Sequence, residues 1–119
     1  MSADDSTIRG AQAQLQKAAL ALAAMADDLA LAKQVKEYNG DRMKRALSER
    51  VVEYLSRGDT ATAAEHKARA DELYHVKADS LALQYQDSMQ IIERADAQRI
   101  LWESARSLLS LEKSKLGLL

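Results

Sequence analysis

The stretch of sequence that decides the fold is IRGAQAQLQKAALALAAMADDLALA, residues 8–32. Apolar residues recur in it at spacings of three and four, which is the heptad pattern of helices that pack side by side. Large residues occupy one position of the repeat and mostly alanines the other: Ile8, Leu15, Leu22 and Leu29 alternate with Ala11, Ala18, Met25 and Ala32. Because alanine lets two helix backbones approach closely, the pattern predicts a narrow antiparallel contact with another helix.

The composition of the 119 residues favours helices over strands. Proline is absent and glycine occurs only four times, so the commonest helix-breaking signals are missing. Good helix formers such as alanine, leucine, glutamine, lysine, arginine and glutamate dominate, whereas phenylalanine is absent and valine and isoleucine are sparse. We therefore predict an all-α protein of the long-helix or coiled-coil class.

Residue types that are missing exclude several kinds of site. With no cysteine, the chain has no disulfide, no thiolate zinc site and no cysteine nucleophile. The most apolar stretch, residues 18–32, is interrupted by Asp27 and Asp28 and is too short and too charged for a membrane span. Residues 1–7 are polar and acidic, unlike the basic start of a signal peptide. We expect a cytoplasmic protein that does not engage a membrane.

The clearest break in the helical pattern is Gly58-Asp59. Here a glycine suited to ending one helix precedes a residue suited to capping the next. The two arms, residues 7–57 and 60–116, are nearly equal in length. We therefore predict one domain, a long antiparallel helical hairpin, preceded by a disordered segment of residues 1–6.

Gly40 is a weaker interruption with two interpretations. The heptad frame slips near it, because after Ala32 the frame gives Lys36 and Asn39. Apolar residues then resume at Met43, Leu47, Val51 and Tyr54. Gly40 either marks a kink or short turn, or is a glycine tolerated inside one continuous helix at a cost of about 1 kcal/mol.

The second arm carries more apolar residues than one helical neighbour can cover. From Ala61 to Leu116 there is neither glycine nor proline, so we expect one uninterrupted helix. Its seam has a spacing near 3.5 residues and comprises Tyr74, Leu81, Tyr85, Ile92, Ala95, Trp102, Leu109 and Leu116. Surplus apolar surface on long helices usually meets another chain. We predict a homo-oligomer, a dimer or higher, with interaction residues Trp102, Ile100, Leu101, Leu108, Leu109 and Leu111.

No arrangement of catalytic residues is present, and we predict a non-enzymatic protein without a cofactor. Glu72-x-x-His75 is a half-motif of di-iron carboxylate bundles, in which one helical turn brings both ligands inward. Such a site also needs a glutamate from a facing helix, and His66 lies on the opposite helical face from His75. A two-helix ferritin-like metal protein is therefore an alternative, but we expect no bound metal.

Basic residues gather between two tyrosines of the first arm. Residues 33–57 carry seven basic and four acidic side chains. Four of the basic residues, Arg42, Lys44, Arg45 and Arg50, lie between Tyr38 and Tyr54. Cationic and aromatic side chains together can track a single nucleic-acid strand. The net charge of the chain is −1, however, so we expect at most weak, salt-sensitive nucleic-acid contact through these four residues.

The segment WESARSLLSLEK, residues 102–113, resembles the C-terminal block of small helical proteins encoded by tailed phages, often near genes for recombination and single-strand annealing. The resemblance covers the C-terminal end of the chain. It implies a small accessory protein in a setting of DNA recombination or anti-defence, and it assigns no role to any residue.

The function favoured by these features is a helical module that self-associates through its seams and offers helical faces to a partner protein. One alternative is an accessory nucleic-acid-binding protein of recombination that uses the 42–50 basic patch. The other is the ferritin-like metal protein described above.

Overall fold

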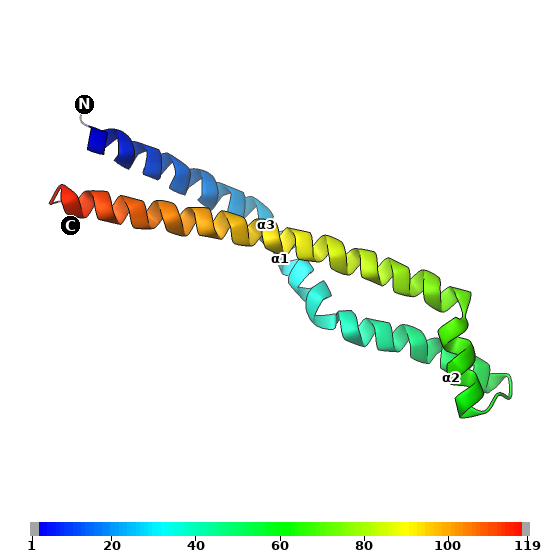
Figure 1. The fold of residues 1–119 in the computed structure, drawn as a ribbon. Coiled ribbons are helices and arrows are strands. Elements are labelled where there is room, and N and C mark those ends of the chain that lie inside the picture. The colour runs from blue at the N-terminus through cyan, green and yellow to red at the C-terminus, as the bar shows by residue number, and fades with distance from the viewer. Residues whose placement is uncertain (1–2, 118–119) are drawn as a thin grey trace. The chain divides into compact units, whose positions relative to one another are not determined.

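The computed structural model describes residues 3–117, and these residues form three α-helices (Figure 1). Helix α1 spans Ala3–Ser56, the short helix α2 spans Ala61–Ala70, and α3 spans Glu72–Lys115. Residues 3–117 contain no strand. The all-α class predicted from the composition is confirmed.

The two long helices run antiparallel, and the chain divides into two units that each contain part of both. The terminal unit combines the chain up to Ala30 with the chain from Ile91 onward, and in it the start of α1 lies beside the end of α3 (Figure 1). The central unit, Leu31–Gln90, contains the remainder of both helices and all of α2. The helical hairpin predicted from the two arms is confirmed.

Alanine dominates the buried seam between the helices. In the terminal unit the most deeply buried residues are Ala11, Ala18, Ala95 and Ala105. Larger seam residues, Trp102 among them, are only partly buried, and no large side chain in the described part of the chain is fully buried. The seam predicted for α3 is buried or partly buried except at Leu116, which is 39% exposed.

The heptad frame of α1 continues through Gly40. Val35 is partly buried beside an exposed Lys36, and the original frame then returns at Asn39 and Met43. Figure 1 shows a bend in the cyan-to-teal part of α1, but the helix is not interrupted and Gly40 has no positive φ. Gly40 therefore does not break the first arm into two helices, which excludes a turn there, and the slip in the frame is confined to one seam position.

The predicted turn at Gly58-Asp59 is confirmed. Gly58 has a φ of +96°, in the left-handed region that glycine adopts without strain. Thr60 then caps α2, because its hydroxyl accepts a hydrogen bond from the Ala63 N–H at 3.3 Å. An ion pair of 2.8 Å between Lys67 and Asp59 attaches the turn to α2.

The second arm is not the single helix predicted, because it is interrupted at Asp71. Asp71 has an extended backbone (φ −70°, ψ 132°), and α3 begins at the next residue. Its N–H donates to the Ala68 carbonyl at 3.2 Å, while its carboxylate accepts the Tyr74 N–H at 3.1 Å. One aspartate therefore ends α2 and caps α3, a role that needs neither glycine nor proline.

The ends of the long helices differ slightly from the expected arms. Helix α1 already includes Ala3–Ser6, which we expected within a disordered segment of residues 1–6. Helix α3 ends at Lys115, and Gly117 follows with a φ of +70°, as is common for a glycine that ends a helix. Residues 1, 2, 118 and 119 lie outside the described residues.

Replacing each of two glycines by alanine separates their roles. Gly40→Ala should raise the free energy of unfolding by about 1 kcal/mol, because Gly40 is helical and an added Cβ meets no atom within 4 Å. Gly58→Ala should lower it by about 1 to 2 kcal/mol, because a residue with a Cβ is strained at its positive φ. Urea unfolding followed by circular dichroism measures both changes. A loss of stability in Gly40→Ala would show that Gly40 occupies a turn.

Candidate functional site

Asp71 is the centre of a polar cluster in the central unit. Its Oδ2 accepts hydrogen bonds from the Tyr54 hydroxyl at 2.6 Å and from Arg50 Nη2 at 3.1 Å, and its Oδ1 accepts the Tyr74 N–H. Arg50 and Tyr54 belong to α1, whereas Asp71 joins α2 to α3, so one carboxylate links all three helices. The Asp71 side chain is only 8% exposed, which limits competition from water.

The neighbours of Asp71 lower its pKa from 3.8 to about 2. The hydrogen bond from Tyr54 is the largest cause, and the Arg50 guanidinium adds to it. In return, the hydrogen bond to Asp71 raises the pKa of Tyr54 and that of Arg50. Around neutral pH the aspartate stays ionised and the tyrosine stays protonated, so neither is suited to proton transfer there. The cluster is a structural junction, and it lacks the properties of an acid–base centre.

Two of the four predicted nucleic-acid contacts lie together. Arg42 and Arg45 line a hollow of about 440 Å³ between α1 and α3 in the central unit, and Lys77 of α3 joins them there. Glu49 is the only carboxylate among the lining residues. The sequence of the first arm could not indicate Lys77, because this residue reaches the hollow only through the antiparallel packing of the second arm.

The other two predicted contacts are placed elsewhere. Arg50 is paired with Asp71, and its Nε is buried with no hydrogen-bond partner among the described residues. Lys44 is exposed but does not line the hollow. The predicted patch is therefore reduced to Arg42 and Arg45, with Lys77 as the third cation.

The half-motif Glu72-x-x-His75 has no third ligand nearby among the described residues. Both residues are exposed, as is His66. Within residues 3–117, no group of three or more histidine, aspartate or glutamate side chains could hold a metal ion. The arrangement therefore gives the ferritin-like alternative no support, and the expectation that no metal binds stays a prediction.

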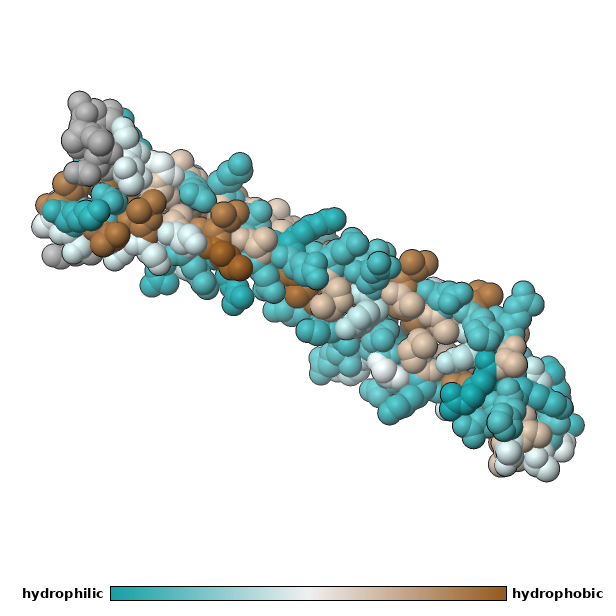
Figure 2. Space-filling view, in the orientation of Figure 1, coloured by the Kyte–Doolittle hydropathy of each residue, from teal (hydrophilic) through white to brown (hydrophobic). Residues whose placement is uncertain are grey.

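The six predicted interaction residues fall into two groups. Trp102 and Leu109 are partly buried in the seam, and the Arg106 guanidinium lies 5.4 Å from the centre of the Trp102 ring. The other four are exposed on α3: Ile100 (57%), Leu101 (41%), Leu108 (39%) and Leu111 (54%). Figure 2 shows exposed apolar residues as separate brown groups among teal polar ones. None of the helices in the described part of the chain is long and apolar enough to cross a membrane.

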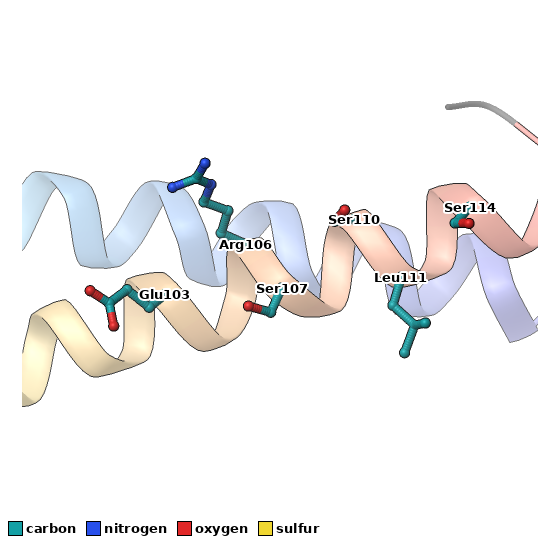
Figure 3. Close-up of a pocket in the computed structure, with 6 residues that line it drawn as sticks. All are labelled: Glu103, Arg106, Ser107, Ser110, Leu111 and Ser114. Carbon is teal, nitrogen blue, oxygen red and sulfur yellow. The ribbon is translucent and has the colours of Figure 1, made fainter.

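A shallow, open strip follows the outer face of α3 beside the exposed leucines. All its lining side chains belong to α3: Glu103, Arg106, Ser107, Ser110, Leu111 and Ser114 (Figure 3). Figure 3 shows Leu111 projecting away from the neighbouring helix. Because a strip on one helix has no facing wall, it cannot enclose a small molecule and is better suited to contact with another helix.

No family model, curated protein or solved structure matches this chain. Any function must therefore be argued from the chain's own residues and their arrangement. The resemblance of residues 102–113 to phage-encoded accessory proteins stays an expectation.

Replacing Asp71 with an uncharged residue should make the stability of the fold depend less on pH in the acid range. Because folding lowers its pKa, the ionised carboxylate stabilises the fold above about pH 4, and this contribution is lost as the pH falls towards 2. Asp71→Asn keeps a capping side chain but should lower the melting temperature by several degrees at neutral pH. The difference from the unmodified chain should shrink between about pH 4 and about pH 2.

The matched control for this measurement is Asp79→Asn, which removes an exposed carboxylate from α3. Its melting temperature should follow that of the unmodified chain at every pH. A stability difference for Asp71→Asn that stays constant from neutral pH to pH 2 would contradict the assigned role of the carboxylate.

Proposed function

We propose that the protein is a non-enzymatic interaction module that self-associates through its helical faces. One observation carries the proposal: the hairpin leaves many of its large apolar side chains exposed. In residues 3–117, thirteen of them are at least 39% exposed, and no large side chain is fully buried. Exposed apolar surface of this extent is typical of a protein that binds another protein.

The outer face of α3 in the terminal unit is the best candidate interface. Its exposed residues repeat at spacings of four and three, as a second heptad stripe beside the buried seam. This outer stripe consists of Ala97, Leu101, Ser104, Leu108 and Leu111, all exposed. Covering one of the leucines is worth roughly 1.5 to 3 kcal/mol before entropic costs. Several leucines together are enough to favour association.

The order of residues in the outer stripe suits a second copy of the same chain. In an antiparallel pair with a twofold axis between residues 102 and 103, Leu101 lies opposite Ser104 of the second copy. Leu108 then lies opposite Ala97, so the four central layers each combine a large side chain with a small one, whereas Leu111 lies opposite Arg94, outside the stripe. Such self-complementarity is required of a twofold interface. The resulting dimer brings four helices together, the number in a four-helix bundle.

We further propose that this module acts in the cytoplasm as a small accessory protein, as the resemblance at residues 102–113 implies. The outer stripe occupies one face of one unit, so other exposed apolar residues, such as Leu73 and Val76 of the central unit, stay free. These faces could bind an unlike protein partner.

Charged substitutions in the outer face should dissociate the oligomer. Leu101→Glu combined with Leu108→Glu places two carboxylates in the outer stripe, where the second copy packs, and desolvating them is costly. The matched control is Leu20→Glu with Leu31→Glu, which changes two leucines that are also exposed (64% and 62%) but lie outside the stripe. Light scattering should give a mass near 13.1 kDa for the first variant and a multiple of it for the control.

The same measurement tests the proposal itself. A mass near 13.1 kDa for the unmodified chain at micromolar concentration would refute self-association. If both variants dissociate equally, the interface does not lie on the outer stripe.

A single cysteine reports the orientation of the two copies, because the chain has none of its own. In the antiparallel pair the two copies of Ser104→Cys are separated along the helix axis by about 5 Å, and those of Ser114→Cys by about 35 Å. A short thiol-specific crosslinker should therefore join the first variant and not the second. Efficient crosslinking of both would indicate a parallel pair, and crosslinking of neither would place the interface elsewhere.

A further inference from the structure

The hollow between α1 and α3 in the central unit holds three cations with no opposing ion pair. Arg42, Arg45 and Lys77 line it, and none of them forms an ion pair with another described residue. The other arginines of the same unit, Arg50, Arg57 and Arg69, all have carboxylate partners. The hollow therefore has a local excess of positive charge, which Glu49 only partly offsets.

We propose that this hollow binds the phosphate groups of a single-stranded nucleic acid. Arginine guanidinium groups present several N–H donors in a planar fork that fits phosphate oxygens. Lys77 approaches from the facing helix, so the three cations surround one concave site. The Gln84 amide also lines the hollow and supplies a neutral hydrogen-bonding group.

Tyr38 supplies the second kind of contact that such a strand needs. Because α1 is continuous through Gly40, Tyr38 lies one helical turn before Arg42 on the same face. Its side chain is 48% exposed, which leaves the ring accessible. A base next to a bound phosphate could stack on this ring. This juxtaposition depends on the helix being unbroken, so the sequence pattern alone did not establish it.

The ring also favours a nucleic acid over an acidic protein segment. An acidic segment would need only the cations, whereas an unpaired base uses the cations and the ring together. Within a duplex the bases are already stacked on each other, so Tyr38 would gain nothing there. The proposal is independent of self-association, because the hollow belongs to the central unit and the outer stripe to the terminal unit.

Fluorescence anisotropy with a labelled oligothymidine, which forms no duplex, measures the binding. Three phosphate contacts to a single strand predict a slope of about −2 for the logarithm of the affinity against the logarithm of salt concentration. Affinity should therefore fall roughly 20-fold between about 50 and about 200 mM salt. The triple variant Arg42→Gln, Arg45→Gln, Lys77→Gln should abolish most of the binding and flatten this slope.

Neighbouring residues of the same charge supply the matched control. Arg45 lines the hollow and Lys44 does not, although both are exposed on α1. Arg45→Gln should weaken binding several-fold and Lys44→Gln should leave it nearly unchanged. Equal losses in the two variants would mean that binding depends on charge in general, and the proposed site would be wrong.

Tyr38→Ala separates a nucleic acid from an acidic protein ligand. It should weaken oligothymidine binding about fivefold or more, the lower end of the range for stacking on one aromatic side chain. Polyglutamate of matched charge should compete poorly. If polyglutamate competes as well as oligothymidine and Tyr38→Ala has no effect, the hollow binds an acidic protein segment and the proposal is overturned. No measurable binding to oligothymidine at the lower salt concentration would overturn it as well.

Discussion

The close approach of two helices through alanine is the constraint on which the structure depends. All but one of the buried apolar residues in the described part of the chain are alanines, Leu81 being the exception. Burying a methyl group contributes roughly 0.8 kcal/mol, about a third to a half of what burying a leucine contributes. A seam of this kind fixes how two helices pack but supplies little stabilisation per turn. Many of the larger apolar side chains stay exposed on the outside of the hairpin.

Polar contacts at Asp71 compensate for the thin apolar core where the chain changes direction. The carboxylate caps α3, accepts the Tyr54 hydroxyl and pairs with Arg50, so it satisfies groups from separate helices at once. Such charge-assisted hydrogen bonds are stronger than neutral ones. They are also directional, which suits a junction that must hold three helix ends in a defined arrangement. The same pairing removes Arg50 from the exposed basic patch, so the geometry of the fold also determines which cations stay available for a ligand.

Much of the fold could be predicted from the sequence, because helical periodicity is a local property. The spacing from Ile8 to Ala32 indicated the α1 seam, and Gly58 indicated the turn, since only glycine adopts its positive φ freely. The break at Asp71 was missed because it is made by a side chain that caps a helix, and an aspartate within a helical pattern is ordinarily a solvated surface residue. Its partners, Arg50 and Tyr54, are far from it in the sequence and meet it only after the hairpin closes.

The candidate site could also be predicted only in part, because helical spacing is a local property and contacts between the two arms are not. Arg42 and Arg45 lie on one helical face, which their spacing alone reveals. The contribution of Lys77 depends on the register between two arms, and that register is set by long-range packing. Conversely, the exposed leucines of α3 could be predicted, because α3 carries more apolar residues than one seam can bury. That conclusion does not depend on the register between the arms.

Self-association and phosphate binding would reinforce each other if both occur. A hollow with three cations makes a weak site, since each phosphate contact is readily displaced by salt. A dimer carries two such hollows, and a strand that reaches both binds the second one at a high effective concentration. The gain can be one hundredfold or more without any new contact, provided that the strand spans the two sites. Oligomerisation through the outer stripe would thus give the dimer a much higher affinity for the strand than a single hollow has. A chain with a net charge of −1 could then bind a nucleic acid without the large positive charge that a single-copy binding protein usually carries.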